Sequence, residues 1–366
     1  MTILFRYLAK EIFLATLFLL FALVALFALF DLIRELGDLG KGNYQLLAVL
    51  TYVSLLQPAR IVVIFPVAAL LGTMFAISRM SSQSELAVMR ASGLSLSRLA
   101  GFAALIGVLF SLLTFFFGEF ITPVSEAWAK RAKLSATSAV VGQEFRSGFW
   151  VKDDRSFVNI QMVTPETHLV NMRVYEFDQA YRLASISLAK EAEYDAQSGR
   201  WRMHEVEKTT FDGGKARIAR LPTAFWNSAM TPDLLAVLRV SPDELSLLNL
   251  YAYIDHLREN KQNSTRYELA FWGKVLQPVA VIIMMLLAIP FAIQSQRAIG
   301  VGGKLLVGIM IGLGFYFLNQ LAAHLTVINN WPPLLSASLP LVAFFLLAAG
   351  LLMLKEYATR LPRRAA

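Results

Sequence analysis

The chain has 366 residues, a formal net charge of +8, no cysteine and 56% hydrophobic residues. This apolar share exceeds the roughly 45–50% of soluble domains, and the mean hydropathy is +0.54, so an ordinary soluble enzyme is excluded and an integral membrane protein is indicated. Without cysteine, disulfides and thiolate nucleophiles or metal ligands are excluded as well.

Long apolar runs lie in two groups, three before residue 121 and three after residue 274. Each reaches the roughly 17–25 residues that a helix needs to cross a membrane. The runs are Ile12–Phe30, Ile61–Ile77, Leu99–Gly118, Val275–Ile293, Leu305–Ala323 and Leu334–Leu354. The first is longer than the roughly 7–15 apolar residues of a signal peptide, so we expect it to be retained. The sequence therefore predicts a membrane all-α body of six transmembrane helices.

The basic residues of the short connecting segments predict the orientation of these helices. One side would carry Arg6, Lys10, Arg79, Arg90, Arg98, Arg297, Lys304, Lys355, Arg360, Arg363 and Arg364. The short segments of the other side carry only Arg34 and Lys41, close to acidic residues. The positive-inside rule then places both termini in the cytoplasm and the central segment outside it. The net positive charge is explained by topology, and no nucleic-acid partner is expected.

The segment between the two groups of apolar runs has the pattern of a β domain. Apolar residues alternate with polar ones, as at Val158, Ile160 and Met162, and turn-forming residues separate short strands. We predict an inserted all-β domain at 122–268, an antiparallel sandwich or open jelly roll with flanking helices, between transmembrane regions 1–121 and 269–366. Ser241 is expected to cap a helix that runs toward Glu259.

A short helix is predicted at about 82–93, in the cytoplasmic loop between the second and third runs. Ser82 can cap it and Gly93 can end it, which leaves roughly ten residues of helix. Leu86 and Met89 share one face, which Glu85 and Arg90 border. Two interpretations stay open: an amphipathic helix lying on the membrane surface, or a docking helix for a cytoplasmic partner.

Catalytic and nucleotide-binding motifs are missing from the sequence. The four histidines are scattered, and the sequence contains neither a His-Glu-x-x-His zinc motif nor a Gly-x-Ser-x-Gly elbow. The segment 300–304 differs from a P-loop, because Ala298 replaces its first glycine and Leu305 its Ser/Thr. The apolar runs hold no carboxylate, which argues against an ion-coupled carrier. We expect a chain that is not an enzyme and has no cofactor; a scaffold or receptor with an external β domain remains an alternative.

The segment Ser84-Glu-Leu-Ala-Val-Met-Arg-Ala-Ser-Gly93 resembles the signature of the lipopolysaccharide-export ABC transporter permeases, the LptF/LptG family. Further segments agree with this family in order and spacing: 6–8, 65–72, 118–119 with Pro123, 272–278 and 315–320. The resemblance is nearer to LptG, notably at Gln277-Pro278 and Asn319-Gln320. The family typically has aspartate where this chain has Asn319, so no carboxylate role is expected there.

The resemblance implies a permease subunit that extracts lipopolysaccharide from the outer leaflet of the bacterial inner membrane and passes it to a periplasmic bridge. ATP hydrolysis in a separate subunit would drive this transport. The implied partners are an LptF-type permease subunit, two LptB-type ATPase subunits, an LptC-type bridge protein and lipopolysaccharide. The β domain would be a periplasmic jelly roll.

The resemblance also assigns roles to individual residues. The coupling helix to the ATPase would use Ser84, Glu85, Leu86, Met89, Arg90 and Gly93. Arg34, Lys130 and Lys133 fall where the family has basic residues in its lipid cavity, while Arg60 is displaced by one position from such a site, and Lys41 is a candidate from its place at the end of the first span. We expect these five cations to meet the phosphates of lipopolysaccharide. The lateral gate on the fifth span would include Gly308, Gly312 and Phe315. Interfacial cations that only extend toward water, and ordinary helix packing at the glycines, remain alternative explanations.

Overall fold

The computed structural model describes residues 2–137, 149–153, 155–163, 168–179, 181–195, 198–212, 215–226, 228, 242, 245–293 and 300–360. The chain divides into two compact units. The first, here called the helical unit, comprises Met1–Asp38, Val49–Ala129 and Thr265–Ala366. The second, here called the β unit, comprises Leu39–Ala48 and Lys130–Ser264.

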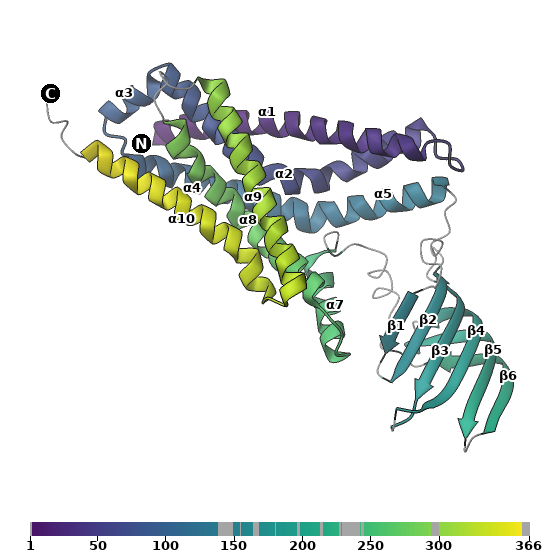
Figure 1. Cartoon of the computed structure of the whole chain (residues 1–366). Helices are drawn as coiled ribbons and strands as arrows, with labels where there is room; N and C mark the ends of the chain where they lie inside the picture. Colours follow the sequence, from purple (N-terminus) through teal and green to yellow (C-terminus); the bar gives the residue numbers. More distant parts are fainter. Residues whose placement is uncertain are drawn as a thin grey trace. The chain divides into compact units, whose positions relative to one another are not determined.

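Long helices form most of the structure (Figure 1). They are α1 (Thr2–Glu35), α2 (Leu46–Ser82), α4 (Leu96–Phe116), α5 (Thr122–Thr137), α8 (Thr265–Ala292), α9 (Val301–Asn329) and α10 (Pro333–Arg360), with the short η1 (Leu36–Asp38), α3 (Glu85–Ala91) and η2 (Phe117–Ile121) between them. Among the described residues, six helical segments are long and apolar enough to cross a membrane, as predicted. The N-terminus, α3 and the end of α10 lie at the same end of the helical unit (Figure 1).

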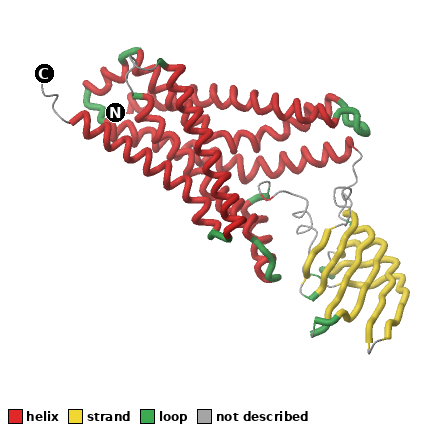
Figure 2. Tube along the Cα trace, viewed as in Figure 1, coloured by secondary structure: helices red, strands yellow, loops and turns green. Residues whose placement is uncertain are grey.

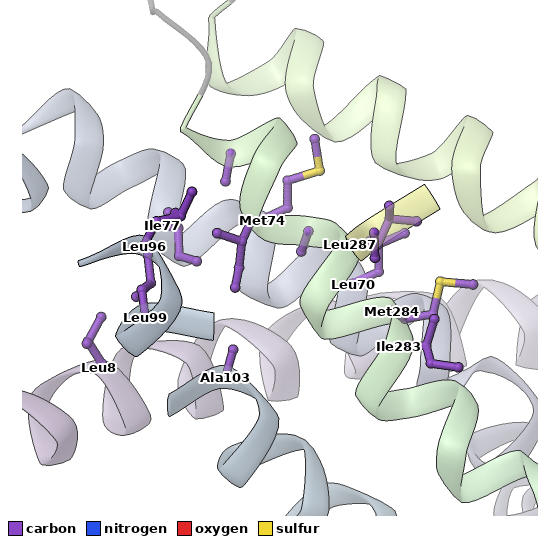
Figure 3. Close-up of a cluster of buried hydrophobic side chains, with 14 of the residues drawn as sticks. Leu8, Leu70, Met74, Ile77, Leu96, Leu99, Ala103, Ile283, Met284 and Leu287 are labelled. Atoms are coloured by element: carbon purple, nitrogen blue, oxygen red, sulfur yellow. The ribbon is translucent and has the colours of Figure 1, made fainter. Parts of the chain in front are cut away.

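The core of the helical unit forms where α1, α2, α4 and α8 meet. Figure 3 shows side chains of these helices converging, among them Leu8 of α1, Leu70 of α2, Leu99 of α4 and Leu287 of α8. All four are almost fully buried. Because lipid is as apolar as these side chains, their close packing, rather than exclusion from water, holds the helices together.

Two details show how these helices tolerate close approach and internal prolines. Pro66 of α2 has no N–H, so the carbonyl of Val62 loses its helical partner. The side-chain amide of Gln277 on α8 donates to this carbonyl at 3.0 Å and satisfies it inside the membrane. At Gly72 a Cβ atom would lie 2.2 Å from Oγ1 and 2.5 Å from Cα of Thr16, so only glycine lets α1 cross α2 there.

The described strands of the β unit form a six-stranded antiparallel sheet in the order β1-β2-β3-β4-β5-β6. Figure 2 shows this sheet in yellow, and Figure 1 labels its strands. The strands are β1 (Phe149–Asp153), β2 (Ser156–Val163), β3 (Leu169–Phe177), β4 (Leu183–Asp195), β5 (Arg200–Asp212) and β6 (Lys215–Trp226). The predicted inserted all-β domain of antiparallel strands is therefore confirmed. Each described strand pairs with its sequence neighbours, so this sheet is a meander without the crossovers of a Greek key.

A crease runs across the sheet from β2 to β6. The register next to it is the same on both sides, but the positions opposite one another at 161, 171, 190, 205 and 222 do not pair. Asn171 and Glu205 on this line have left-handed backbone, with φ of 52° and 50°. Ala189 and Ala192, three residues apart on β4, are both buried. In a strictly alternating strand, the apolar side chains beyond this line would point to the opposite face of the sheet. The crease keeps them on the same face, around the fully buried Trp201.

A polar cluster on three strands involves Glu176. This residue accepts a hydrogen bond from Ser185 of β4 and pairs with Lys208 of β5 at 3.1 Å. Burial raises the pKa of the Glu176 carboxyl, but the hydrogen bonds from Ser185 and Lys208 and the charge of Lys208 bring that pKa below its usual value.

The helix predicted to follow Ser241 begins later in the structure. It is α7 (Leu247–Glu259), and the hydroxyl of Ser246 accepts from the backbone N–H of Asn249 at 3.3 Å, so Ser246 is its N-cap. Ser241, Asp243 and Glu244 lie outside the described residues.

Candidate functional site

The helix predicted between the second and third spans is α3, which has seven residues. Ser82 does not cap it, because Ser82 is the last residue of α2 and its hydroxyl donates to the carbonyl of Arg79 at 2.6 Å. The N-cap position is Ser84, whose φ is 63° and whose side chain makes no capping bond. This left-handed residue turns the chain sharply from α2 into α3.

The predicted stop at Gly93 is confirmed. Gly93 has a φ of +100°. Its N–H donates to the carbonyl of Arg90 at 3.1 Å, and the N–H of Leu94 donates to the carbonyl of Met89 at 3.1 Å. These two bonds make the Schellman motif, which satisfies the last carbonyls of a helix and turns the chain away.

The apolar pair of α3 packs into the chain's own core. Leu86 is 3% exposed in the cluster that also holds Leu8, and Met89 packs against the same cluster. On the other side of α3, Val88 is 68% exposed, and Ala87, Arg90 and Ala91 are exposed too. Because Leu86 and Met89 are used inside the chain, they are not available to anchor α3 in a lipid surface. The outward face of α3, defined here as Ala87, Val88, Arg90 and Ala91, is the part that a partner protein can reach.

Polar side chains tie the beginning of α1 to α2 and α3. The hydroxyl of Tyr7 donates to Oε2 of Glu85, the first residue of α3, at 2.8 Å. One turn further along α1, Glu11 pairs with Arg79 of α2 at 3.1 Å. Of the predicted coupling residues, Glu85, Leu86 and Met89 therefore face the helical unit, whereas Ser84, Arg90 and Gly93 are exposed.

Two of the predicted lipid-binding cations belong to the helical unit and differ in their surroundings. Arg60 of α2 forms a two-point pair with Asp31 of α1, at 2.8 Å from Nε and 2.7 Å from Nη2. The side chain of Asp31 is 5% exposed. Arg34 is 3.9 Å from the same carboxylate, and its side chain is 74% exposed. Arg60 is thus engaged by an internal carboxylate, while most of Arg34 remains accessible to a ligand.

The other three predicted cations, Lys41, Lys130 and Lys133, belong to the β unit. Lys133 of α5 lies over the ring of Tyr44, with its Nζ 5.8 Å from the ring centroid, and Tyr44 is fully buried. The N–H of Asn43 donates to the carbonyl of Ala136 at 2.7 Å, which fastens the loop 39–45 to the end of α5. Lys130 and Lys133, three residues apart, therefore lie on a helix end that this loop holds in place.

The predicted gate residues pack within the chain. A Cβ at Gly308 would lie 2.7 Å from Leu71, and one at Gly312 would lie 2.7 Å from Val67, so both glycines bring α9 close to α2. Phe315 meets Phe344 of α10 edge to face at 5.2 Å. The opposite side of α9 is apolar and exposed. This outward face of α9 comprises Leu306, Met310, Leu313 and Phe317, which are 57–66% exposed.

The sequence patterns do not single out Tyr7, Asp31 or Val88. Tyr7 lies in the segment 6–8, and Asp31 is one of the acidic residues close to Arg34. The helical phase could have identified Val88, because residues two apart point to nearly opposite sides of a helix and Leu86 is a strong candidate for burial.

Comparison with known proteins adds an independent observation. The family model "Lipopolysaccharide export system permease LptF/LptG" matches residues 6–354. The chain is 32% identical over 355 residues to the lipopolysaccharide export system permease protein LptG of Escherichia coli (strain K12), which covers 97% of this chain and 99% of that protein. It is also 32% identical over 351 residues to the protein of that name in Haemophilus influenzae, covering 96% of this chain and 98% of that one.

Proposed function

Because the chain belongs to the lipopolysaccharide export system permease LptF/LptG family, we propose that it is the permease subunit of an ATP-driven lipopolysaccharide transporter. It extracts lipopolysaccharide from the outer leaflet of the inner membrane and passes it to a periplasmic bridge. The chain is a multi-pass inner membrane protein with six candidate spans. In this proposal both termini lie in the cytoplasm, the β unit lies in the periplasm, and the chain is not itself an enzyme.

The observation that supports this proposal most is the geometry of α3. Leu86 and Met89 join the core of the helical unit, while the outward face carries the small Ala87 and Ala91 with Val88 between them and Arg90 beside them. A helix held this firmly on one side can pass a displacement to the membrane helices, and small exposed residues let a partner approach closely. We assign the outward face of α3 to the groove of an LptB-type ATPase, two copies of which would serve this chain and an LptF-type subunit.

Lipid binding is proposed for Arg34 and for three lysines of the β unit. The phosphates of lipopolysaccharide favour guanidinium and ammonium groups, and partial desolvation strengthens such pairs. Arg34 is mostly exposed, so in the helical unit we assign phosphate contact to Arg34 and an internal role to Arg60. Lys41, Lys130 and Lys133 are the corresponding candidates in the β unit.

The contact with the LptF-type subunit is assigned to the outward face of α9, because Gly308, Gly312 and Phe315 are already used inside the chain. This face would form one side of a lateral gate. The β unit would then deliver lipid to an LptC-type bridge protein.

Co-purification tests the ATPase assignment. The wild-type chain, expressed with candidate LptF-type and LptB-type subunits, should retain the ATPase in a fixed ratio, and Val88→Glu should lose it because the new charge is buried in the contact. Val124→Glu is the matched control, since Val124 is similarly exposed, at 57%, on α5. A wild-type chain that retains no ATPase would instead support a scaffold or receptor.

Lipid release from proteoliposomes tests the cation assignment separately. The double variant Arg34→Glu with Lys133→Glu should retain the ATPase but release less lipopolysaccharide, because both side chains then repel phosphate. Release equal to that of the wild type would contradict the assigned role of these cations.

A further inference from the structure

The beginning of α1 is joined to α2 and α3 by both apolar and polar contacts. Leu8 is fully buried and Ile12 is 1% exposed, and Tyr7 and Glu11 make the polar contacts with Glu85 and Arg79 described above. Beyond this end, one face of α1 is exposed within the chain, with Leu17 at 51%, Phe18 at 68% and Phe21 at 73%. The contacts at the beginning of α1 can therefore pass a displacement between α3 and α1.

Glu85 is well placed to receive such a displacement. It is the first residue of α3, and the positive end of the helix dipole favours its carboxylate there. Short turns join α3 to α2 through the left-handed Ser84 and to α4 through the left-handed Gly93. The side chain of Ser84 makes no capping bond. Contacts made by other side chains therefore fasten α3 to the rest of the unit. Leu86 provides an apolar contact, and Tyr7 provides a directional one.

We propose that Tyr7 is a positioning residue that couples α3 to α1. Its hydroxyl holds one carboxylate oxygen of Glu85, so that α1 moves with α3 when the ATPase displaces α3. This inference rests on the proposed function, because it takes α3 to be the helix that the ATPase moves. It adds a route from that helix to α1, which carries exposed apolar side chains within the candidate span.

The test uses Tyr7→Phe, which removes the hydroxyl and keeps the ring. In the reconstituted complex with LptF-type and LptB-type subunits, the variant should keep the wild-type ratio of ATPase and continue to hydrolyse ATP. The lipopolysaccharide released per ATP should fall about fivefold or more, within the usual range of coupling between sites. Tyr357→Phe on α10, where the side chain is 67% exposed, is the matched control and should release as much lipid per ATP as the wild type.

A distance measurement separates coupling from a general structural effect. Because the chain has no cysteine, single cysteines at Phe18 of α1 and Leu105 of α4, both exposed, can be labelled selectively in the full complex. ATP should change the distance between the two labels in the wild type and leave it unchanged in Tyr7→Phe. The double variant Tyr7→Phe with Glu85→Gln should release no less lipid per ATP than the more impaired single variant, because both changes act on one hydrogen bond.

Unchanged lipid release per ATP in Tyr7→Phe would overturn the inference, and so would loss of the ATPase or a lower melting temperature in that variant. A failure of the proposed function appears earlier and in a different way. In that case the wild-type chain retains no ATPase or releases no lipid.

Discussion

Replacing Gly72 by alanine should destabilise the helical unit by about 1–3 kcal/mol, the usual cost of overfilling a packed core. The new Cβ would lie 2.5 Å from Cα and 2.7 Å from N of Thr16. The first distance is about 1 Å shorter than the roughly 3.5 Å at which carbon atoms attract each other best. Backbone atoms cannot rotate away as a side chain can. The two helices would therefore have to separate at their crossing, and α1 would lose contact with the buried Ala68 and Ala69 region of α2.

Denaturant titration of the detergent-solubilised protein measures this effect. Gly101→Ala on α4 is the matched control, because no atom lies within 4 Å of a Cβ added there. That variant should be unchanged or more stable by about 0.5–1 kcal/mol through its better helix propensity. Thr16→Ala should rescue Gly72→Ala only in part, because it removes the hydroxyl and leaves the backbone contacts. Equal stability of the two alanine variants, or full rescue by Thr16→Ala, would refute the steric reasoning.

Three further predictions concern stability. Gln277→Ala should lower the free energy of unfolding by about 1–3 kcal/mol in the same titration, because it leaves the buried carbonyl of Val62 unpaired. Pro66→Ala should reduce that loss, because it restores the helical N–H to this carbonyl. An equal loss with and without Pro66 would contradict this explanation. Trp201→Ala should lower the free energy of unfolding of the β unit by about 3–5 kcal/mol. The measurement is proteolysis of the full chain, which should cleave faster between residues 149 and 226. Unchanged cleavage would argue against Trp201 as the centre of this core. Glu176 has a lowered pKa, so its stabilisation is complete above the usual glutamate pKa and is lost as the pH falls through the lowered value. The difference in melting temperature between wild type and Glu176→Gln should therefore be largest near pH 7 and shrink below about pH 4; a difference that grows in acid would show the opposite shift.

The sequence alone predicts the class of this protein well, and the physical reason is the membrane. A run of about 20 apolar residues has few alternatives to a spanning helix, because only a helix or closed barrel satisfies every backbone group in lipid. The period-two pattern around Val158 and Ile160 likewise predicts half-buried strands. The turn at Gly93 was predictable because a left-handed residue is needed to end α3 there.

The tertiary structure decided how the candidate site residues are used. Helical periodicity shows that Leu86 and Met89 share a face, but only the neighbouring α1, α2 and α4 show that this face is internal. The sequence predicts Arg60 to lie among the cations near one membrane surface. The fold brings it to Asp31, which is 29 positions away along the chain. Gly308 and Gly312 permit close helix approach in any setting, and the fold identifies the approaching helix as α2.

Length and apolar content thus determine which segments cross the membrane. The free energy of inserting a segment is summed over all its residues and depends little on neighbouring segments. Which face of a helix turns inward, which charge is engaged and where a sheet bends are decided by contacts between residues far apart in the chain. Asn171, Glu205 and Pro222 illustrate this, since they belong to three different strands and only the fold aligns them on one crease.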